Sequence, residues 1–240
     1  MTPREAGTRV VFLGGLGEVG RNMFAVQSRG KILIVDAGLS FPTEEMPGVD
    51  LVLPDFTWVA DRADQCCGIV LTHGHEDHVG ALTWLLQKID VPVYGTPLTL
   101  GMARKRMSEF GISSDMVQVA APGQKTIGPF ECRFLSVSHS IPDTMAVVVD
   151  TTDGRIVYTS DFKLDESPID GRLTDLAGFA ELGREGVDLL LSDSTNAERP
   201  GRTPSEAIIG PVLQEIFDNA RRRVIIACFA SNLHRIQQVC

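Results

Sequence analysis

Three of the five histidines of this 240-residue chain lie within six positions of one another, in the segment 72–78 (THGHEDH). The segment has the spacing HxHxDH and directly follows a short apolar run that is typical of a buried strand. At the end of a strand, His73 and His75 can point to the same side, and Asp77 and His78 can then face a second position close by. Imidazole and carboxylate donors together suit Zn²⁺. Four donors are more than one metal usually takes from so short a stretch, so the spacing predicts two adjacent metal ions.

Three further polar residues follow predicted strands elsewhere in the chain. His139 comes just after the stretch 132–137, and Asp161 comes just after the stretch 155–159. A carboxylate at a strand end can bridge two cations about 3.5–4 Å apart, and the alternative for Asp161 is a turn or a helix cap. Asp193 either shapes a turn or orients a catalytic histidine. We expect His139 and Asp161 to complete the metal site.

A glycine-rich motif near the N-terminus suggests a different chemistry at first sight. Residues 15–20 read GxGxxG after a predicted strand, and Asp36 lies 16 residues beyond, as in dinucleotide-binding folds. That motif needs a helix of roughly ten residues or more to begin within it. Here residues 21–27 alternate like a strand, and the next strand, 31–35, follows at once. The motif therefore indicates a glycine-rich turn near an active site.

The elements that must position these residues are mostly strands. Short β-branched runs separated by turn residues predict strands at 9–13, 23–27, 31–35, 68–72, 91–94, 132–137, 145–150, 155–159, 187–192 and 223–229. The turn sequence TTDG joins two of these runs and predicts an antiparallel hairpin. Apolar spacing predicts helices at 78–89, 97–110 and 203–223. The last helix is expected to open with a capping box from Thr203 to Glu206, and Gly210-Pro211 should either kink it or delay its regular part.

Composition sets the class of protein. Lys and Arg number 22 against 31 Asp and Glu, a net charge of −9, with 43% apolar and 22% charged residues. These values are typical of a soluble globular protein of one large domain and argue against a surface that coats polyanions generally. The chain has no apolar run long enough to span a membrane and no N-terminal signal-peptide pattern. Five cysteines without a CxxC pair suggest reduced thiols and a cytoplasmic location.

Seven segments spread over the chain carry specific motifs: FLGGLGEVGRN (12–22), DAGLSFP (36–42), LTHGHEDHVGA (71–81), HSIPD (139–143), TSDFKLD (159–165), SDSTNAERPG (192–201) and CFASNLHRIQQ (228–238). In this order they resemble the metallo-β-lactamase fold and, within it, the bacterial ribonuclease J family of β-CASP nucleases. The resemblance implies an α/β fold, the four-layer αββα sandwich, over residues 1–205. Residues 206–240 would begin an inserted β-CASP domain, so we expect a fragment of a longer protein. Ser160 stands where the family usually has glycine, and we expect the change to be harmless.

The resemblance also implies a role for each site residue. Two zinc ions would be bound, the first by His73, His75 and His139 and the second by Asp77 and His78, with Asp161 bridging and Asp36 supporting the metal loop. The catalytic residues would be Asp77, Asp161 and Asp193, and the substrate-binding residues would be Ser231, Asn232 and His234. A further histidine for the second metal, the general-acid histidine and the pocket for the RNA 5′ phosphate would come from a later segment. We therefore expect these 240 residues alone to cleave RNA poorly or not at all.

The activity implied by the resemblance is that of a zinc-dependent 5′-to-3′ exoribonuclease and endoribonuclease in mRNA decay and rRNA maturation. Its substrate would be single-stranded RNA with a 5′ monophosphate, and a homo-oligomer and an RNA-degradation complex would be its assemblies. Other zinc hydrolases of the same fold, for tRNA 3′ ends, thioesters or lactones, are the first alternative. Di-iron oxidoreductases of this fold resemble HxExDH, and His75 occupies the position of that Glu. The remaining alternative is a catalytically silent scaffold that binds RNA-degradation partners.

Overall fold

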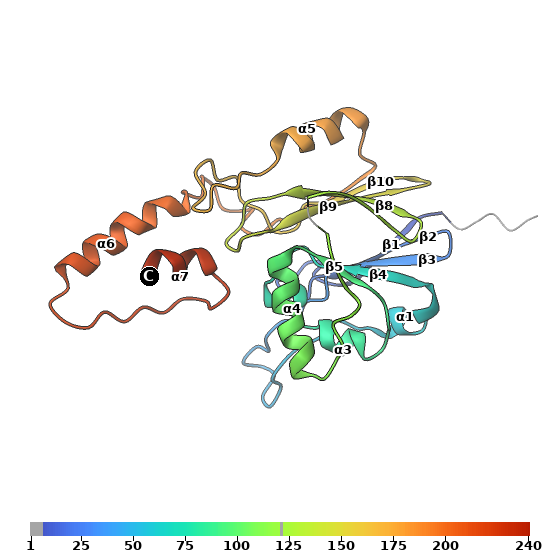
Figure 1. The fold of residues 1–240 in the computed structure, drawn as a ribbon, viewed down its shortest axis with the longest axis horizontal. Helices are drawn as coiled ribbons and strands as arrows, with labels where there is room; N and C mark the ends of the chain where they lie inside the picture. The colour runs from blue at the N-terminus through green and yellow to red at the C-terminus, as the bar shows by residue number, and fades with distance from the viewer. Residues whose placement is uncertain (1–6, 121) are drawn as a thin grey trace, which may run out of the picture.

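Two β-sheets packed face to face form the core of the computed structural model, which describes residues 7–120 and 122–240 (Figure 1). The first sheet has the order β1-β2-β3-β4-β5-β6, with strands Arg9–Gly14, Met23–Ser28, Lys31–Val35, Cys66–Val70, Val93–Gly95 and Val117–Val119. It is antiparallel from β1 to β3 and parallel from β3 to β6. The first six residues, where the sequence shows no signal-peptide pattern, lie outside the described residues.

The second sheet has the order β11-β10-β9-β8-β7, with strands Leu189–Leu191, Gly154–Tyr158, Met145–Thr151, Phe130–Ser136 and Gly123–Ile127. The predicted hairpin across TTDG is confirmed as the antiparallel pair β9 and β10. Only the pairing of β10 with β11 is parallel in this sheet. Strands β6 and β7 were not predicted, since their sequences, VQV and GQKTI, are short or mostly polar.

Helices cover the outer face of each sheet, which gives the four layers of an αββα sandwich (Figure 1). The helices are α1 Thr57–Ala60, α2 Glu76–Val79, α3 Leu82–Leu86, α4 Pro97–Glu109, α5 Leu176–Glu185, α6 Ile209–Asn219 and α7 Leu233–Val239. Short 3₁₀ helices lie at Ala63–Gln65 and Glu206–Ile208. Apolar side chains fill three layers, between α1, α3, α4 and the first sheet, between the sheets, and between the second sheet and α5. No described helix is long and apolar enough to cross a bilayer.

The predicted helix 78–89 is wrong as a single element. It is divided into α2 and α3, and the backbone that follows β3 explains the division. Ala37 N donates to the carbonyl of His78 at 2.7 Å, and Ala81 N donates to the carbonyl of Ala37 at 2.8 Å. A continuous helix would need the His78 carbonyl for its own i to i+4 hydrogen bond. The backbone after β3 therefore holds residues 78–81 in place and interrupts the helix there.

The C-terminal part of the chain also differs from the prediction. Residues 223–229 form no strand, because no described strand lies beside them, and Ile225 and Phe229 are 86% and 85% exposed. Ser205, and not Thr203, caps the turn that leads into α6, since its hydroxyl accepts from Ala207 N. Of the two expectations for Gly210-Pro211, the structure shows the delay, since α6 begins only at Ile209. Pro211 lies in its first turn, where the missing N–H is tolerated, and the helix is not kinked there.

Candidate metal centre

Residues 71–75 join β4 to α2, and together with the first residues of α2 we call them the metal loop. Its start is held by Asp36, which follows β3 in the left-handed region with φ of +59°. The Asp36 carboxylate accepts from Thr72 N at 2.8 Å, and Met145 N of β9 donates to the carbonyl of Thr72 at 3.1 Å. Thr72 is thus hydrogen-bonded to the end of β3 in the first sheet and to the start of β9 in the second. This places His73, directly after Thr72, in the buried space between the sheets.

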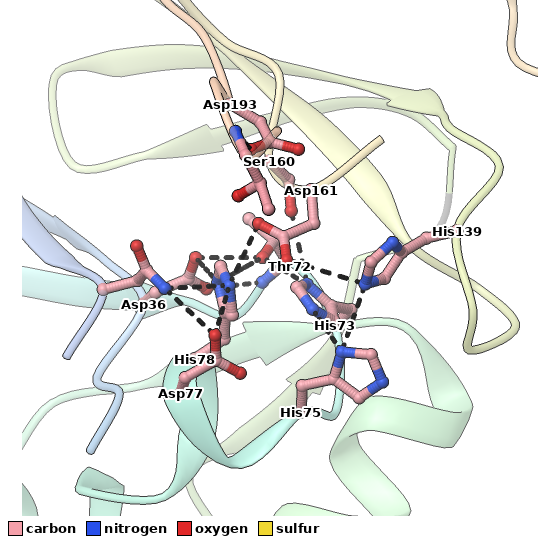
Figure 2. Close-up of polar contacts among 12 residues, drawn as sticks. Asp36, Thr72, His73, His75, Asp77, His78, His139, Ser160, Asp161 and Asp193 are labelled. Atoms are coloured by element: carbon pink, nitrogen blue, oxygen red, sulfur yellow. Dashed lines mark hydrogen bonds and ion pairs between the residues drawn. The ribbon is translucent and has the colours of Figure 1, made fainter. Parts of the chain in front are cut away.

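Three imidazoles and a carboxylate form the first donor group, around one position (Figure 2). His75 Nδ1 lies 3.2 Å from His73 Nε2 and 3.1 Å from His139 Nε2. Asp161 Oδ2 lies 3.6 Å from His139 Nε2. Zinc–nitrogen bonds of 2.0–2.1 Å in a tetrahedral site separate neighbouring donors by about 3.3 Å. The distances between these nitrogens are therefore those of ligands around one cation.

A second donor group lies beside the first and shares Asp161 with it. It consists of Asp77, His78 and Asp161. Asp161 Oδ1 lies 3.3 Å from His78 Nε2, while its other oxygen faces His139 of the first group (Figure 2). Asp77 Oδ2 lies 3.7 Å from the same His78 nitrogen. One carboxylate with an oxygen toward each group is the arrangement by which a bridging ligand serves two metal ions.

Each fully buried histidine has its other nitrogen held by a polar partner. His78 Nδ1 lies 2.8 Å from Asp36 Oδ2, and a carboxylate in that place fixes the ring and leaves Nε2 free to bind a metal. His73 Nδ1 lies 3.1 Å from Thr72 Oγ1 and 3.3 Å from Ser160 Oγ. Ser160 is buried, with φ of +55°, where a residue without Cβ would be unstrained. The hydroxyl of Ser160 therefore lies directly behind a candidate ligand.

Burial and neighbouring charges set different protonation states in the two groups. Burial lowers the pKa of His73 well below its usual value, lowers that of His75, and lowers that of His139 to about 4. Burial opposes the charge of His78, yet the carboxylates of Asp36 and Asp161 raise its pKa well above the usual value. Burial also opposes the charge of Asp161, but its hydrogen bond with His78 and the nearby imidazoles lower its pKa to about 2.

The remaining predicted site residues surround the two groups without joining them. Asp193 accepts from Thr195 N at 2.8 Å, which is a turn contact, and from Phe162 N, the residue after Asp161, at 3.5 Å. Its predicted role toward a catalytic histidine stays a prediction. The structure thus shows the turn role and places Asp193 next to the segment that carries the shared carboxylate (Figure 2).

Three predicted substrate-binding residues lie at the start of α7. Asn232 caps the helix by accepting from Arg235 N at 3.1 Å, and the backbone of Ser231 faces the imidazole of His75. His234 is buried and lines a cavity of about 70 Å³ together with His139. Contact of these residues with RNA stays a prediction. What the structure adds is that α7 lies against the first donor group.

Sequence reasoning missed two residues of the centre. Thr72 was treated as part of the strand, although it contacts Asp36 and His73. Asn22 places its side-chain nitrogen 3.1 Å from His78 Nε2, and its only sequence signal is its position at the end of the glycine-rich motif. Both contacts join residues brought together by the meeting of β2, β3 and β4, so spacing along the chain does not reveal them.

Comparison with known proteins agrees with this geometry. The sequence profile described as Metallo-beta-lactamase superfamily matches residues 16–203. Ribonuclease J of Mycobacterium tuberculosis is 49% identical over 97% of this chain and 42% of its own length. Ribonuclease J of Mycolicibacterium smegmatis is 47% identical with the same coverage, and Ribonuclease J2 of Bacillus subtilis is 43% identical over 96% of this chain. The chain thus spans about two fifths of the length of these relatives.

Solved structures share the fold at low identity. A protein of unknown function from Enterococcus faecalis superimposes with a TM-score of 0.68 at 16% identity, over 98% of this chain and 63% of that one. A diphosphatase of the PhnP family gives a TM-score of 0.56 at 18% identity, over 88% of this chain and 83% of that one. These likenesses support the αββα sandwich, and the profile match covers most of the chain. The chain therefore belongs to the metallo-β-lactamase superfamily.

Proposed function

We propose that this chain carries the hydrolytic metal centre of a ribonuclease of the ribonuclease J type, with two zinc ions and RNA as its substrate. The observation that carries the proposal is the shared carboxylate of Asp161, which has one oxygen toward each of two donor groups. The chain in which it occurs is 47–49% identical, over 97% of its length, to two mycobacterial proteins named ribonuclease J. Such a site suits a nuclease, because phosphodiester cleavage places negative charge on both the attacking and the leaving oxygen, and two metal ions can stabilise both.

The donor chemistry fits zinc. His73, His75 and His139 offer three nitrogens with lowered pKa values, so their lone pairs are free at neutral pH. Asp161 supplies a carboxylate to this group, and Asp77 and His78 complete the second group with one carboxylate and one imidazole. When bound, two zinc ions supply Lewis acidity and an activated water nucleophile.

The chain's own residues orient these donors and handle the proton. Asp36 holds the proton on His78 Nδ1, which keeps Nε2 directed at the second position. Asp161, with a pKa of about 2, is a weak proton acceptor. Asp77 has a side chain that is 35% exposed and lies beside the same position, so we assign it the proton released by the attacking water.

The substrate and the assembly are proposed from the relatives and from the predicted site. We propose single-stranded RNA with a 5′ monophosphate, bound with the help of Ser231, Asn232 and His234, and cut in both the 5′-to-3′ exonucleolytic and the endonucleolytic manner. Asp193 is proposed to orient the general-acid histidine of a later segment. The superfamily match ends at residue 203, which supports a domain boundary near 205 and a second domain from 206 onward. A cytoplasmic location, a homo-oligomer and a role in mRNA decay and rRNA maturation complete the proposal.

The test is metal-dependent hydrolysis by the chain and its variants. We expect the chain to bind two zinc ions and to hydrolyse bis(p-nitrophenyl) phosphate. Cleavage of a 5′-monophosphorylated RNA is expected to be slower, since the chain spans 42% of its ribonuclease relatives. His73→Ala should lose zinc and hydrolysis together, whereas Val19→Ala, in an exposed side chain outside both groups, should retain both. Full hydrolysis by His73→Ala, or none by the zinc-loaded chain, contradicts the proposal.

A further inference from the structure

The three predicted substrate-binding residues lie at the start of α7, and α6 and α7 extend to one side of the αββα sandwich (Figure 1). His234 of α7 and His139 line the same cavity of about 70 Å³, so the position of α7 sets the space beside the first donor group. Ile236 of α7 is 36% exposed, so apolar packing holds this helix only in part. Polar contacts must therefore contribute to keeping it in place.

Lys163 follows the shared carboxylate of Asp161 by two residues, and its backbone is fixed to the metal centre. Its N–H donates to the carbonyl of Ser138 at 2.7 Å, directly before His139. The hydroxyl of Thr174 reinforces this contact, since it accepts from Ser138 N at 3.0 Å and donates to the carbonyl of Lys163 at 3.4 Å. The backbone of Lys163 therefore has a defined place relative to both Asp161 and His139.

The ammonium group of Lys163 faces two carboxylates from different segments. Its Nζ atom lies 3.6 Å from Asp165 Oδ2 and 3.8 Å from Glu206 Oε1, and the lysine side chain is 18% exposed. The Asp165 carboxylate, 2% exposed, accepts from Ser167 N at 3.0 Å and from Glu206 N at 3.2 Å. Burial opposes the charge of Asp165, but its hydrogen bonds lower its pKa, so it is charged at neutral pH. Such partly buried charges are screened less than exposed ones.

Glu206 connects these charges to α7. Its Oε2 atom lies 2.9 Å from the guanidinium of Arg235, in the first turn of α7. A second contact comes from the same loop, since Asp170 Oδ2 lies 3.5 Å from His234 Nε2. A continuous series of charged contacts therefore runs from Lys163, beside the metal centre, to helix α7.

We propose that Lys163 is a positioning residue for the proposed reaction, which holds α7 and its predicted RNA-binding residues at a fixed place beside the first donor group. The inference rests on the proposed binding of RNA by α7. It gives the segment that follows Asp161 a role apart from metal binding. Loosening α7 should therefore weaken the binding of RNA, whereas the candidate metal ligands keep their own contacts and should bind zinc as before.

The experiment measures three quantities on the chain and its variants: zinc affinity by chelator competition, hydrogen exchange of residues 231–239, and affinity for a single-stranded RNA whose phosphorothioate linkages slow hydrolysis. Lys163→Met keeps the length of the side chain and removes its charge, and Glu206→Gln removes the opposite charge. We expect both variants to bind RNA about 3- to 10-fold more weakly and to exchange faster in α7, with unchanged zinc affinity. The double variant should bind RNA no more weakly than Glu206→Gln, because the two residues act as one unit.

The controls separate positioning from general attraction of RNA. Because the two substitutions change the net charge in opposite directions, general attraction of the phosphates would weaken binding in Lys163→Met and strengthen it in Glu206→Gln. Lys163→Arg keeps the cation and should retain both RNA affinity and slow exchange in α7. Lys88→Met removes the charge of an exposed lysine elsewhere and should leave the exchange of α7 unchanged.

The outcomes separate this inference from the proposed function. Opposite changes of RNA affinity in Lys163→Met and Glu206→Gln overturn the inference, and so does exchange in α7 that neither variant alters. Loss of zinc together with RNA affinity also overturns it, because Lys163 would then support the metal centre itself. An unmodified chain that binds zinc but no RNA overturns the proposed function and this role with it, and hydrogen exchange then shows separately whether Lys163 holds α7.

Discussion

The two donor groups on either side of Asp161 are built from the same residue types but are held in different ways. In the first, burial keeps His73, His75 and His139 neutral, and the hydroxyls of Thr72 and Ser160 contact the far side of His73. In the second, His78 lies between carboxylates, with Asp36 behind it and Asp161 in front.

The difference shows that burial and neighbouring charges affect the protonation of a histidine ligand in opposite directions. Burial alone removes the proton from an imidazole, since the charged form loses its hydration. A carboxylate partner instead raises the basicity of the ring and directs its other nitrogen, but it also favours the proton that a cation must displace. The first group is therefore ready for a cation at neutral pH, whereas the second gains its cation in competition with a proton.

The largest expected effect comes from the residue that both groups share. Asp161→Asn keeps the shape of the side chain but removes the charge that faces both groups. We expect hydrolysis and binding of both zinc ions to weaken by more than about 100-fold, beyond the 10- to 100-fold loss typical of outer partners. Chelator competition and diester hydrolysis measure the two effects. A variant that loses only one ion shows that Asp161 belongs to one group and does not bridge.

Asp36→Asn should weaken zinc binding by the second donor group but not by the first. The variant retains an acceptor for His78 Nδ1 but loses the negative charge, and asparagine tolerates the left-handed backbone at this position. We expect the second zinc ion to bind about 10- to 100-fold more weakly and the first to bind as before. Stepwise zinc affinities provide the measurement. Equal weakening of both steps means that Asp36 supports the metal loop as a whole.

The groups should also respond differently to pH. Burial lowers the pKa of all three imidazoles of the first group, that of His139 to about 4, so we expect this group to take up few protons as the pH falls from 7 to 6. The carboxylates of Asp36 and Asp161 raise the pKa of His78 well above the usual value, so a cation at this nitrogen competes with a proton. We expect the affinity for the second ion to fall about tenfold from pH 7 to pH 6, with the first nearly constant. Zinc titration at both pH values measures the two affinities. If the affinities of both groups fall by the same factor, the contrast between the groups is wrong.

The smallest effect is expected at Ser160. Ser160→Gly removes the hydroxyl near His73 Nδ1 and relieves the left-handed backbone, whereas Ser160→Ala removes the hydroxyl and keeps the Cβ. Loss of one hydrogen bond of about 0.5–1.5 kcal/mol should weaken the first zinc ion roughly 2- to 10-fold in both variants. Only the glycine variant should gain stability in denaturant unfolding. Unchanged zinc affinity in both shows that Thr72 alone supports His73 and that the serine is harmless, as the sequence comparison with the family implies.

Much of the fold follows from local patterns. The hairpin of β9 and β10 was predicted from TTDG and its flanking β-branched runs, and helix α4 from apolar spacing at 97–110. Both depend on residues near one another in the chain, so a short window contains the necessary information. The strand predicted at 223–229 has the same apolar pattern, yet it remains exposed because no described strand pairs with it. An apolar pattern indicates that a segment can be buried, but the segment is buried only where a neighbouring strand packs beside it.

The sequence by itself determined the chemistry of the centre, since HxHxDH, His139 and Asp161 already supply imidazole and carboxylate donors at strand ends. Only the tertiary structure decided how these donors are divided. The shared position of Asp161, the support of His78 by Asp36 and the approach of Asn22 all join residues that are far apart in the chain. Their distances depend on the packing of one sheet against the other and on the left-handed turns before Asn22 and at Asp36. Spacing along a sequence cannot express such relations, because they arise only when separate strands end at the same place.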